Sequence, residues 1–435
     1  MRSLVAVVLG MVVVLGPACG GSRRSGFGPD DEDAGGHGSS GSSSSSGGSP
    51  GESSSSGSSG GGSSSGSAAG SLVGDGGMGS VPQGCPPCST ENVNIAGSTC
   101  DLDCSGSTSP PVSCDTGLAV DGPASAFAQA IGICQMADAT HWGLVSASYT
   151  RGYDSTTVPA DGQHAILPGF GTVITPREGG SLGVLSSGYA LPCDDGDAST
   201  ICSASGTGDP YFKGIQFPMY EGQGSSPPSY PKSTASCQAD SSVYDTIGVT
   251  LQIKVPANAQ GFSFDFDFYS GEWPEFVCTE FNDSFVAWLQ STAWAGNGGD
   301  LNISLDSMNN PVSVNNGFFD RCTMNAETGC AGGGGFGTTG GGGSAQTAAC
   351  AGGPAELQGT GFYNEGMYCS IQTTTGGGAT GWLTTKAPVT GGETITLQLI
   401  IWDTGDWSYD SSVLVDNLQW YGTAQMTGTT RPPAQ

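Results

Sequence analysis

Two short segments gather the acidic residues that could do chemistry. Residues 271–283 read GEWPEFVCTEFND and hold three Glu and one Asp. Residues 400–417 read IIWDTGDWSYDSSVLVDN and place Asp residues between two apolar runs. Neither segment contains Lys or Arg, so no local cation offsets their charge. The candidate site residues are Glu272, Glu275, Asp283, Asp403, Asp406 and Asp410.

These acids have two non-catalytic interpretations. Asp residues in turns often bond their own backbone, so the acids could simply shape solvated turns. Alternatively, carboxylates that lie close together are costly unless they protonate, stay solvated or share a cation. Ca²⁺ takes six to eight oxygen ligands, which clustered carboxylates, Asn and carbonyl groups supply. We therefore predict that the two segments meet in the fold and that the six candidates hold one Ca²⁺.

An enzymatic interpretation is also open. Two carboxylates at a suitable separation can cleave a glycosidic bond, and Glu272 and Glu275 are a conceivable pair. However, they lie three residues apart around one turn instead of facing each other across a substrate. The chain has three His, at positions 37, 141 and 164, which are too few and too scattered for a His metal site. We expect no catalytic site and no cofactor besides Ca²⁺; the alternative is a secreted Ca²⁺-dependent hydrolase acting on polysaccharide.

Aromatic residues accompany the acids. Trp273, Trp402 and Trp407 could be exposed and stack on sugar rings, or they could fill the edge of the core.

The acidic segments follow apolar runs typical of β-strands. In FSFDFDF, the four Phe at 262, 264, 266 and 268 share one face, which must be core. Asp265 and Asp267 share the other face, which is either solvated or lines a site. Further strand-like runs are 142–149, 164–170, 181–187, 246–255, 261–270, 284–291, 301–306, 394–403 and 411–420. Frequent short strands with Gly-rich connections predict an all-β domain, a β-sandwich or jelly roll with long loops.

One segment is expected to be helical. In residues 121–134, Asp121 can cap the N-terminus of the helix and Pro123 suits its first turn. One face of the helix is apolar and holds Ala124, Phe127, Ala130 and Ile131. The longest expected loop, 330–350, is rich in Gly and bracketed by Cys. It lacks the GK[ST] ending that a phosphate-binding loop needs.

The charge of the chain restricts its partners. Asp and Glu (39) outnumber Lys and Arg (11), giving a net charge of −28. Nucleic acid is excluded, because phosphates must be neutralised by clustered cations. Cations, neutral glycans or another surface protein remain compatible partners.

The cysteines and the N-terminus indicate export. Fifteen Cys predict multiple disulfides in an oxidising compartment. MRSLVAVVLGMVVVLGPAC has a cation, a short apolar run, small residues and Cys19, which resembles a bacterial lipoprotein signal. We predict lipidation of Cys19, which would anchor the protein in the outer membrane at the cell surface; ordinary cleavage with Cys19 free is the alternative.

The expected organisation has five parts. Residues 1–19 form the signal with its anchor cysteine, and residues 20–80, rich in Gly and Ser, form a disordered tether. Residues 81–111 form a small Cys-rich segment, in which disulfides are favoured over zinc. The main domain covers residues 112–425, and residues 426–435 form a tail.

The residues of the main domain carry a resemblance. Three stretches resemble the choice-of-anchor L domain of bacterial surface proteins, in the form found in myxobacterial lipoproteins. They read SFDFDFYSGEWPEFVCTEFNDSFVAWL, NISLDSMNNPVSVNN and TGWLTTKAPVTGGETITLQLIIWDTGDWSYDSSVLVDN. This resemblance covers about residues 112–422 and implies a surface location without implying an activity. We therefore expect a tethered surface lipoprotein that acts as a non-enzymatic binding or adhesion module, dependent on Ca²⁺.

Overall fold

The computed structural model describes residues 114–192, 203–204, 211–212, 224–233, 237–315, 318–329, 346–347, 349–366 and 374–432. The predictions for the signal and Cys19, the tether, the Cys-rich segment 81–111 and most of the loop 330–350 fall outside these residues.

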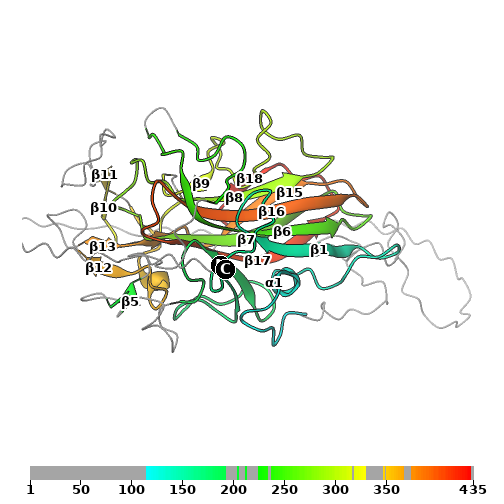
Figure 1. Cartoon of the computed structure of the whole chain (residues 1–435), viewed down its shortest axis with the longest axis horizontal. Helices are drawn as coiled ribbons and strands as arrows, with labels where there is room; N and C mark the ends of the chain where they lie inside the picture. The colour runs from blue at the N-terminus through cyan, green and yellow to red at the C-terminus, as the bar shows by residue number, and fades with distance from the viewer. Residues whose placement is uncertain are drawn as a thin grey trace, which may run out of the picture. The chain divides into compact units, whose positions relative to one another are not determined.

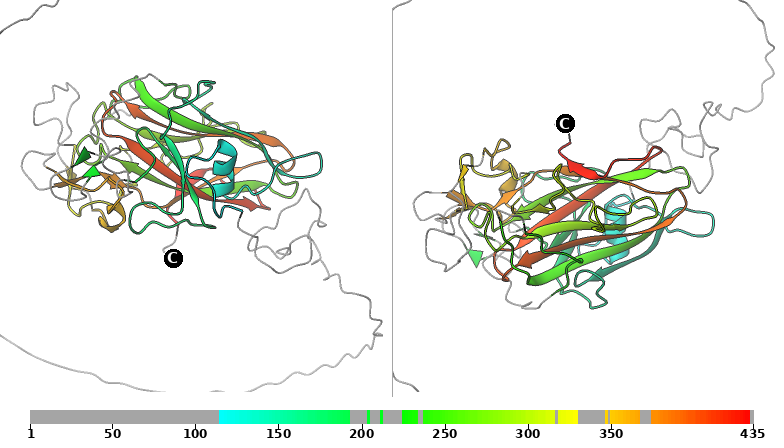
Figure 2. Two further views of the ribbon diagram at one scale, coloured as in Figure 1. Left: turned by 60° about the horizontal axis from the view of Figure 1, so that its bottom comes forward. Right: turned by 90° about the horizontal axis from the view of Figure 1, so that it is seen from above.

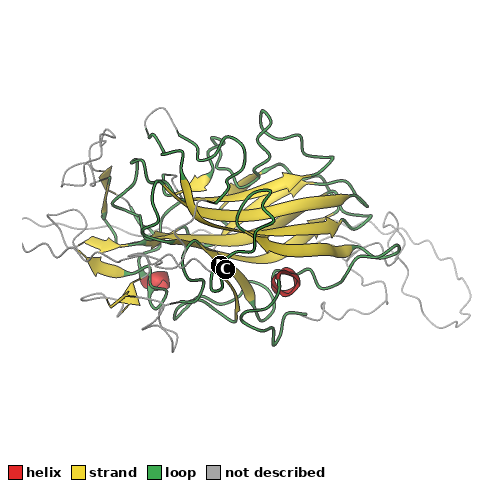
Figure 3. Ribbon diagram, viewed as in Figure 1, coloured by secondary structure: helices red, strands yellow, loops and turns green. Residues whose placement is uncertain are grey.

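Two antiparallel sheets form the domain, as the sequence predicted (Figures 1 and 3). The five-stranded sheet has the order β1-β6-β16-β8-β9. Its strands are β1 (Gly143–Thr150), β6 (Val243–Lys254), β16 (Thr394–Thr404), β8 (Ser284–Gln290) and β9 (Val312–Ser313). The larger sheet has the order β18-β15-β7-β17-β3-β2, and β14 also pairs with β7. Its strands are β18 (Gly428–Thr430), β15 (Leu383–Pro388), β7 (Gly261–Ser270), β17 (Ser411–Tyr421), β3 (Leu182–Ser186), β2 (His164–Leu167) and β14 (Gly378–Ala379).

Short elements lie outside these two sheets. Three small pairs are β4 (Ser203–Ala204) with β5 (Tyr211–Phe212), β10 (Glu327–Thr328) with β11 (Gln346–Thr347), and β12 (Asn364–Gly366) with β13 (Thr374–Gly376). A 3₁₀ turn, η2, spans Ala355–Leu357. The segment assigned to a C-terminal tail contributes β18, which pairs with β15.

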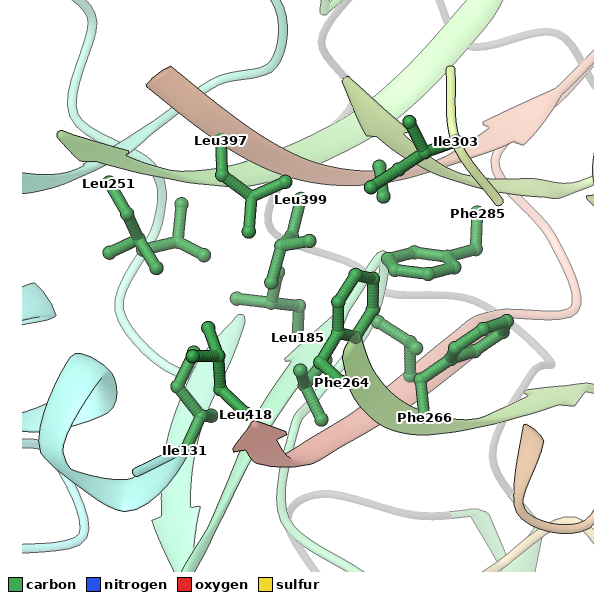
Figure 4. Packing of buried hydrophobic residues seen from close by; sticks show 14 of the residues in the cluster. Ile131, Leu185, Leu251, Phe264, Phe266, Phe285, Ile303, Leu397, Leu399 and Leu418 are labelled. Carbon is green, nitrogen blue, oxygen red and sulfur yellow. The ribbon is translucent and has the colours of Figure 1, made fainter. Parts of the chain in front are cut away.

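The main core fills the space between the two sheets (Figure 4). Phe264 and Phe266 of β7 point toward Phe285 of β8, and the Phe266 and Phe285 rings lie 4.8 Å apart. The prediction of a core Phe face on β7 is confirmed, since all four of its Phe are buried. Burial of each such side chain stabilises the fold by roughly 1.5–3 kcal/mol.

The predicted helix is present but shorter. Helix α1 spans Ala124–Ala130, and its N-cap is Pro123. Asp121 therefore does not cap it, because the helix begins later than expected and has no side-chain cap. The predicted apolar face of α1 is buried and packs against β1 of the five-stranded sheet and against β2 and β3 of the larger sheet. Helix α1 therefore closes one edge of the sandwich, between the two sheets (Figure 2).

Two expectations about strands need correction, and one open alternative is decided. The run 301–306 forms only isolated bridges, Trp288 with Asn302 and Leu305 with Pro311, instead of a strand. Strand β15 was missed, because LTTKAP carries few large apolar residues. The face of β7 that holds Asp265 and Asp267 is buried, because loop residues such as Phe170 and Leu357 cover the outer side of the larger sheet.

Three disulfides join described residues and confirm the oxidised state expected for these cysteines. They link Cys114 to Cys134, Cys237 to Cys278, and Cys322 to Cys350. The second disulfide holds the GEWPEFVCTEFND segment to the chain that precedes β6, and it thereby fixes the connection that carries the first group of candidate acids.

Candidate functional site

The two acidic segments meet where β7 and β16 end and where β8 and β17 begin. The backbone N–H of Thr404 donates to Asp283 Oδ1 at 2.9 Å, and the Ser411 hydroxyl donates to Asp283 Oδ2 at 2.6 Å. The N–H of Asp283 in turn donates to Glu272 Oε2 at 3.3 Å. Segments more than 100 residues apart in the sequence thus share one hydrogen-bonded network.

Four of the six candidates form the centre of this site. We call Glu272, Asp283, Asp403 and Asp410 the strand-end acids; all four are buried. Among the ion pairs of the described residues, none involves Glu272, Asp283 or Asp403. No Lys or Arg of the described part of the chain therefore balances the charge of these three acids.

The other two candidates are more peripheral. Asp406 is half-buried, and its Oδ1 accepts the N–H of Ser408 at 2.9 Å, as in a local turn. Its charge still acts on Glu272 and raises the pKa of that carboxyl. Burial alone raises the pKa of Glu275 to about 7, and Glu275 influences Tyr409 instead of the strand-end acids.

Asp403 is the most unusual of the strand-end acids. It is 1% exposed, and neither carboxylate oxygen accepts a hydrogen bond of normal geometry from the described residues. An ionised carboxylate in this position is costly, because burial removes its water and no donor replaces that water. A shift in register between β6 and β16 occurs here and sets Asp403 opposite Tyr244.

Burial and mutual repulsion favour the protonated form of these groups. Burial raises the pKa of Asp403 well above its ordinary value, and the charges of Asp283, Asp410 and Asp245 raise it further. The pKa of Glu272 is also well above its ordinary value, because of burial and the charge of Asp283. Burial raises the pKa of Asp283 to about 7, although the Ser411 and Thr404 donors oppose this shift.

Sequence reasoning missed three contributors to the site. Asp245 on β6 is buried, and its charge acts on Asp403. The Ser187 hydroxyl accepts the N–H of Ser411 at 2.9 Å and also stabilises ionised Asp403. Gly188 leaves room for Asp410, since a Cβ there would lie 1.9 Å from Asp410 Oδ2. A polar residue within an otherwise apolar strand, as in VYDTIG, was the available signal for Asp245.

Within the described residues, no three acidic, His or Cys side chains converge closely enough to hold a metal ion as they stand. The carboxyls instead form a buried cluster in which Glu272 and Asp283 are joined by a hydrogen bond and the pKa values are raised. The glycosidase pair is also disfavoured, because Glu272 is buried and bonded to the backbone of Asp283, where a polysaccharide could not reach it.

A second acidic group lies on the outer face of the larger sheet. We call Asp265, Asp267 and Asp416 the outer-face acids. Asp265 accepts hydrogen bonds from Arg177 Nε at 3.1 Å, the Thr384 hydroxyl at 2.6 Å and Asn417 Nδ2 at 2.9 Å. Of the two alternatives for the face that holds Asp265 and Asp267, the solvated one is wrong, because loop residues cover these acids and neighbouring side chains donate to them.

Asp267 and Asp416 also have partners. Asp267 accepts from the Tyr269 hydroxyl at 3.1 Å and the Thr380 hydroxyl at 3.2 Å. Asp416 Oδ2 accepts the backbone N–H of Arg177 at 2.6 Å. Burial nevertheless raises the pKa of Asp267 and of Asp416 to about 7.

The tryptophans near the strand-end acids do not form a platform for sugars. Trp402 is fully buried, and Trp273 is buried and stacks on Phe319 with centroids 5.8 Å apart. Trp407 is partly buried and packs edge-on against Tyr244. The alternative that these residues complete the core is therefore correct for Trp273 and Trp402.

Comparison with known families identifies the domain. Residues 232–418 match the family model described as Choice-of-anchor L domain. This chain contains a choice-of-anchor L domain. No curated protein and no solved structure matches it.

The choice-of-anchor L domain includes β6 to β8, β15, β16 and most of β17, and hence all four strand-end acids. The domain is typical of surface-anchored, non-catalytic proteins, so the chain is assigned to the cell surface or the exported fraction. In the described part of the chain, no helix has the length and apolarity needed to cross a membrane.

Proposed function

We propose that this protein is a lipid-tethered surface module that binds an extracellular glycan or surface protein, and that Ca²⁺ bound by the strand-end acids stabilises it. The observation that carries the metal proposal is the carboxylate of Asp403, which is buried, accepts no hydrogen bond of normal geometry from the described residues and faces the charges of Asp283, Asp410 and Asp245.

The chemistry of this group suits a hard cation. Ca²⁺ prefers carboxylate and carbonyl oxygens and tolerates irregular geometry, and it would replace the protons that these acids otherwise retain. The side chains would have to rotate toward the ion, while the strand ends that carry them stay in place. The backbone carbonyl of Asn282, which accepts the Thr404 hydroxyl at 3.0 Å, is a further oxygen nearby.

The metal proposal predicts a calcium-dependent stability. EDTA should lower the melting temperature, and Ca²⁺ should restore it more than Mg²⁺, since binding to the native state at 100 times Kd adds about 2.7 kcal/mol. Asp403→Asn should abolish the response while leaving the protein folded. Asp154→Asn is the control, because Asp154 is exposed and its positive φ of 49° suits Asn. A melting curve that ignores both EDTA and Ca²⁺ would overturn the proposal.

The tether has its own test. Cys19→Ser should move the protein from the membrane fraction to the soluble fraction and abolish labelling with a lipid precursor, because the acylated thiol would be lost. Equal membrane recovery of the substituted and natural proteins would show that the anchor lies elsewhere.

A further inference from the structure

A small cavity opens on the outer face of the larger sheet, away from the strand-end acids. Its volume is about 280 Å³, and its lining includes Val173, Thr175, Arg177, Glu356 and Trp382. Val173 and Thr175 belong to the loop between β2 and β3, Glu356 to η2, and Trp382 directly precedes β15. Three separate segments therefore contribute side chains to one hollow.

Arg177 is held in place while part of its guanidinium stays available. Its Nε donates to Asp265 at 3.1 Å, its backbone N–H donates to Asp416, and its guanidinium carbon lies 5.9 Å from the Trp382 ring centroid. Among the described residues, no acceptor takes a hydrogen bond from its two terminal amino groups. A ligand in the cavity would thus meet a preorganised pair of donors.

Glu356 and Trp382 provide complementary groups. Glu356 Oε2 accepts from Arg321 Nε at 2.6 Å, and no described residue donates to its other oxygen. The indole N–H of Trp382 also lacks an acceptor among the described residues. The cavity therefore combines donors, an acceptor, the partly buried Trp382 ring and the apolar side chain of Val173.

The charge balance of the cavity disfavours an ionic ligand. Asp265 neutralises Arg177, and Arg321 neutralises Glu356. An anion would be repelled by Glu356 and by the net charge of −28, whereas a cation would meet Arg177. A neutral ligand with hydroxyl groups that both donate and accept, and with a C–H surface for Trp382 and Val173, fits this set of groups.

We propose that this cavity binds one neutral pyranose unit of an extracellular glycan. Its volume lies just below the range of pockets for drug-sized ligands, which suits a single sugar ring. The inference deepens the proposed binding role, but it does not depend on the calcium site.

The test is a blocking substitution on the full-length protein. Val173→Trp should fill the cavity with little effect on folding, because Val173 is 52% exposed. Val158→Trp is the matched control, because Val158 is 77% exposed and does not line the cavity. The probes are the methyl glycosides of glucose and galactose, N-acetylglucosamine and, as the anionic comparison, glucuronate, titrated with detection by saturation-transfer NMR.

The expected result is that at least one neutral sugar binds and that Val173→Trp weakens it at least tenfold, while Val158→Trp does not. Trp382→Phe, which removes the indole N–H, should weaken binding by a smaller factor. The site is overturned if no neutral sugar binds, if glucuronate binds more tightly than every neutral probe, or if Val173→Trp leaves the affinity unchanged. In this last case sugars bind elsewhere and the proposed binding role stands without this site.

Discussion

The strand-end acids and the outer-face acids are both buried, but they differ in the groups that surround them. Arg177 pairs with Asp265, and the charge of Arg321 lowers the pKa of Asp267. Asp283, at the centre of the strand-end acids, has hydroxyl and backbone donors but no ion pair among the described residues.

This difference separates two uses of the same residue type. A buried carboxylate with an arginine partner is satisfied within the chain and has a structural role. A buried group of carboxylates without such a partner must hold protons or accept an external cation. The outer-face acids are therefore assigned to the scaffold, and the strand-end acids remain the candidate ligand site.

The largest expected effect comes from removing the cation of the outer face. Arg177→Met should lower the free energy of unfolding by about 3–5 kcal/mol, because breaking a buried pair leaves the Asp265 charge uncompensated. Urea denaturation followed by tryptophan fluorescence measures this change.

Arg151→Met is the matched control, since Arg151 has no ion pair among the described residues and should cost well under 1 kcal/mol. Equal effects of the two substitutions would mean that Asp265 does not need its arginine, and the distinction between the two groups would fail.

A smaller effect is expected from pH in the presence of EDTA. Asp283 has an ordinary pKa of 3.8 and a folded pKa of about 7, so between these values the folded state holds a proton that the unfolded state has lost. The part of the stability that depends on Asp283 should therefore be highest near pH 4, fall as pH rises, and level off above pH 7. Each such carboxyl contributes about 1.4 kcal/mol per pH unit.

Calcium should change the pH dependence that comes from the strand-end acids, but not the part that comes from the outer-face acids. The metal favours ionised strand-end acids and binds more tightly as pH rises, so it should reduce the loss of stability between pH 5 and 7.5. The part due to Asp267, whose folded pKa is also about 7, should persist. If the pH profiles in EDTA and in Ca²⁺ are identical, the strand-end acids bind no Ca²⁺ and have a structural role like that of the outer-face acids.

Much of the fold could be predicted from local patterns. Strict alternation identified β7 and its Phe core, and the long apolar runs identified β6, β8, β16 and β17 within a few residues. Strand β15 was missed because Thr and Lys at alternate positions give a weak apolar signal. The run 301–306 was assigned as a strand because local alternation does not reveal whether a partner strand is present.

The candidate site was predictable only in part, for a physical reason. The two segments that carry Glu272, Asp283, Asp403 and Asp410 contain no Lys or Arg, which marked these acids as candidates, and their positions at strand ends brought them together. Ser187 and Asp245 come from segments with no acidic cluster, so only the tertiary pairing of β3 with β17 and of β6 with β16 brings them to the site. The cover over Asp265 likewise comes from a loop nearly ninety residues earlier in the chain.

The pairing of strands also shows that the matched family segment is not the folding unit. Residues 232–418 exclude β1, β3 and β18, which pair with β6, β17 and β15 respectively. A fragment limited to the match would leave three strands with unpaired backbone N–H and C=O groups. Such open edges can recruit strands from other molecules. We therefore expect this fragment to aggregate more readily than a longer chain that includes β1, β3 and β18.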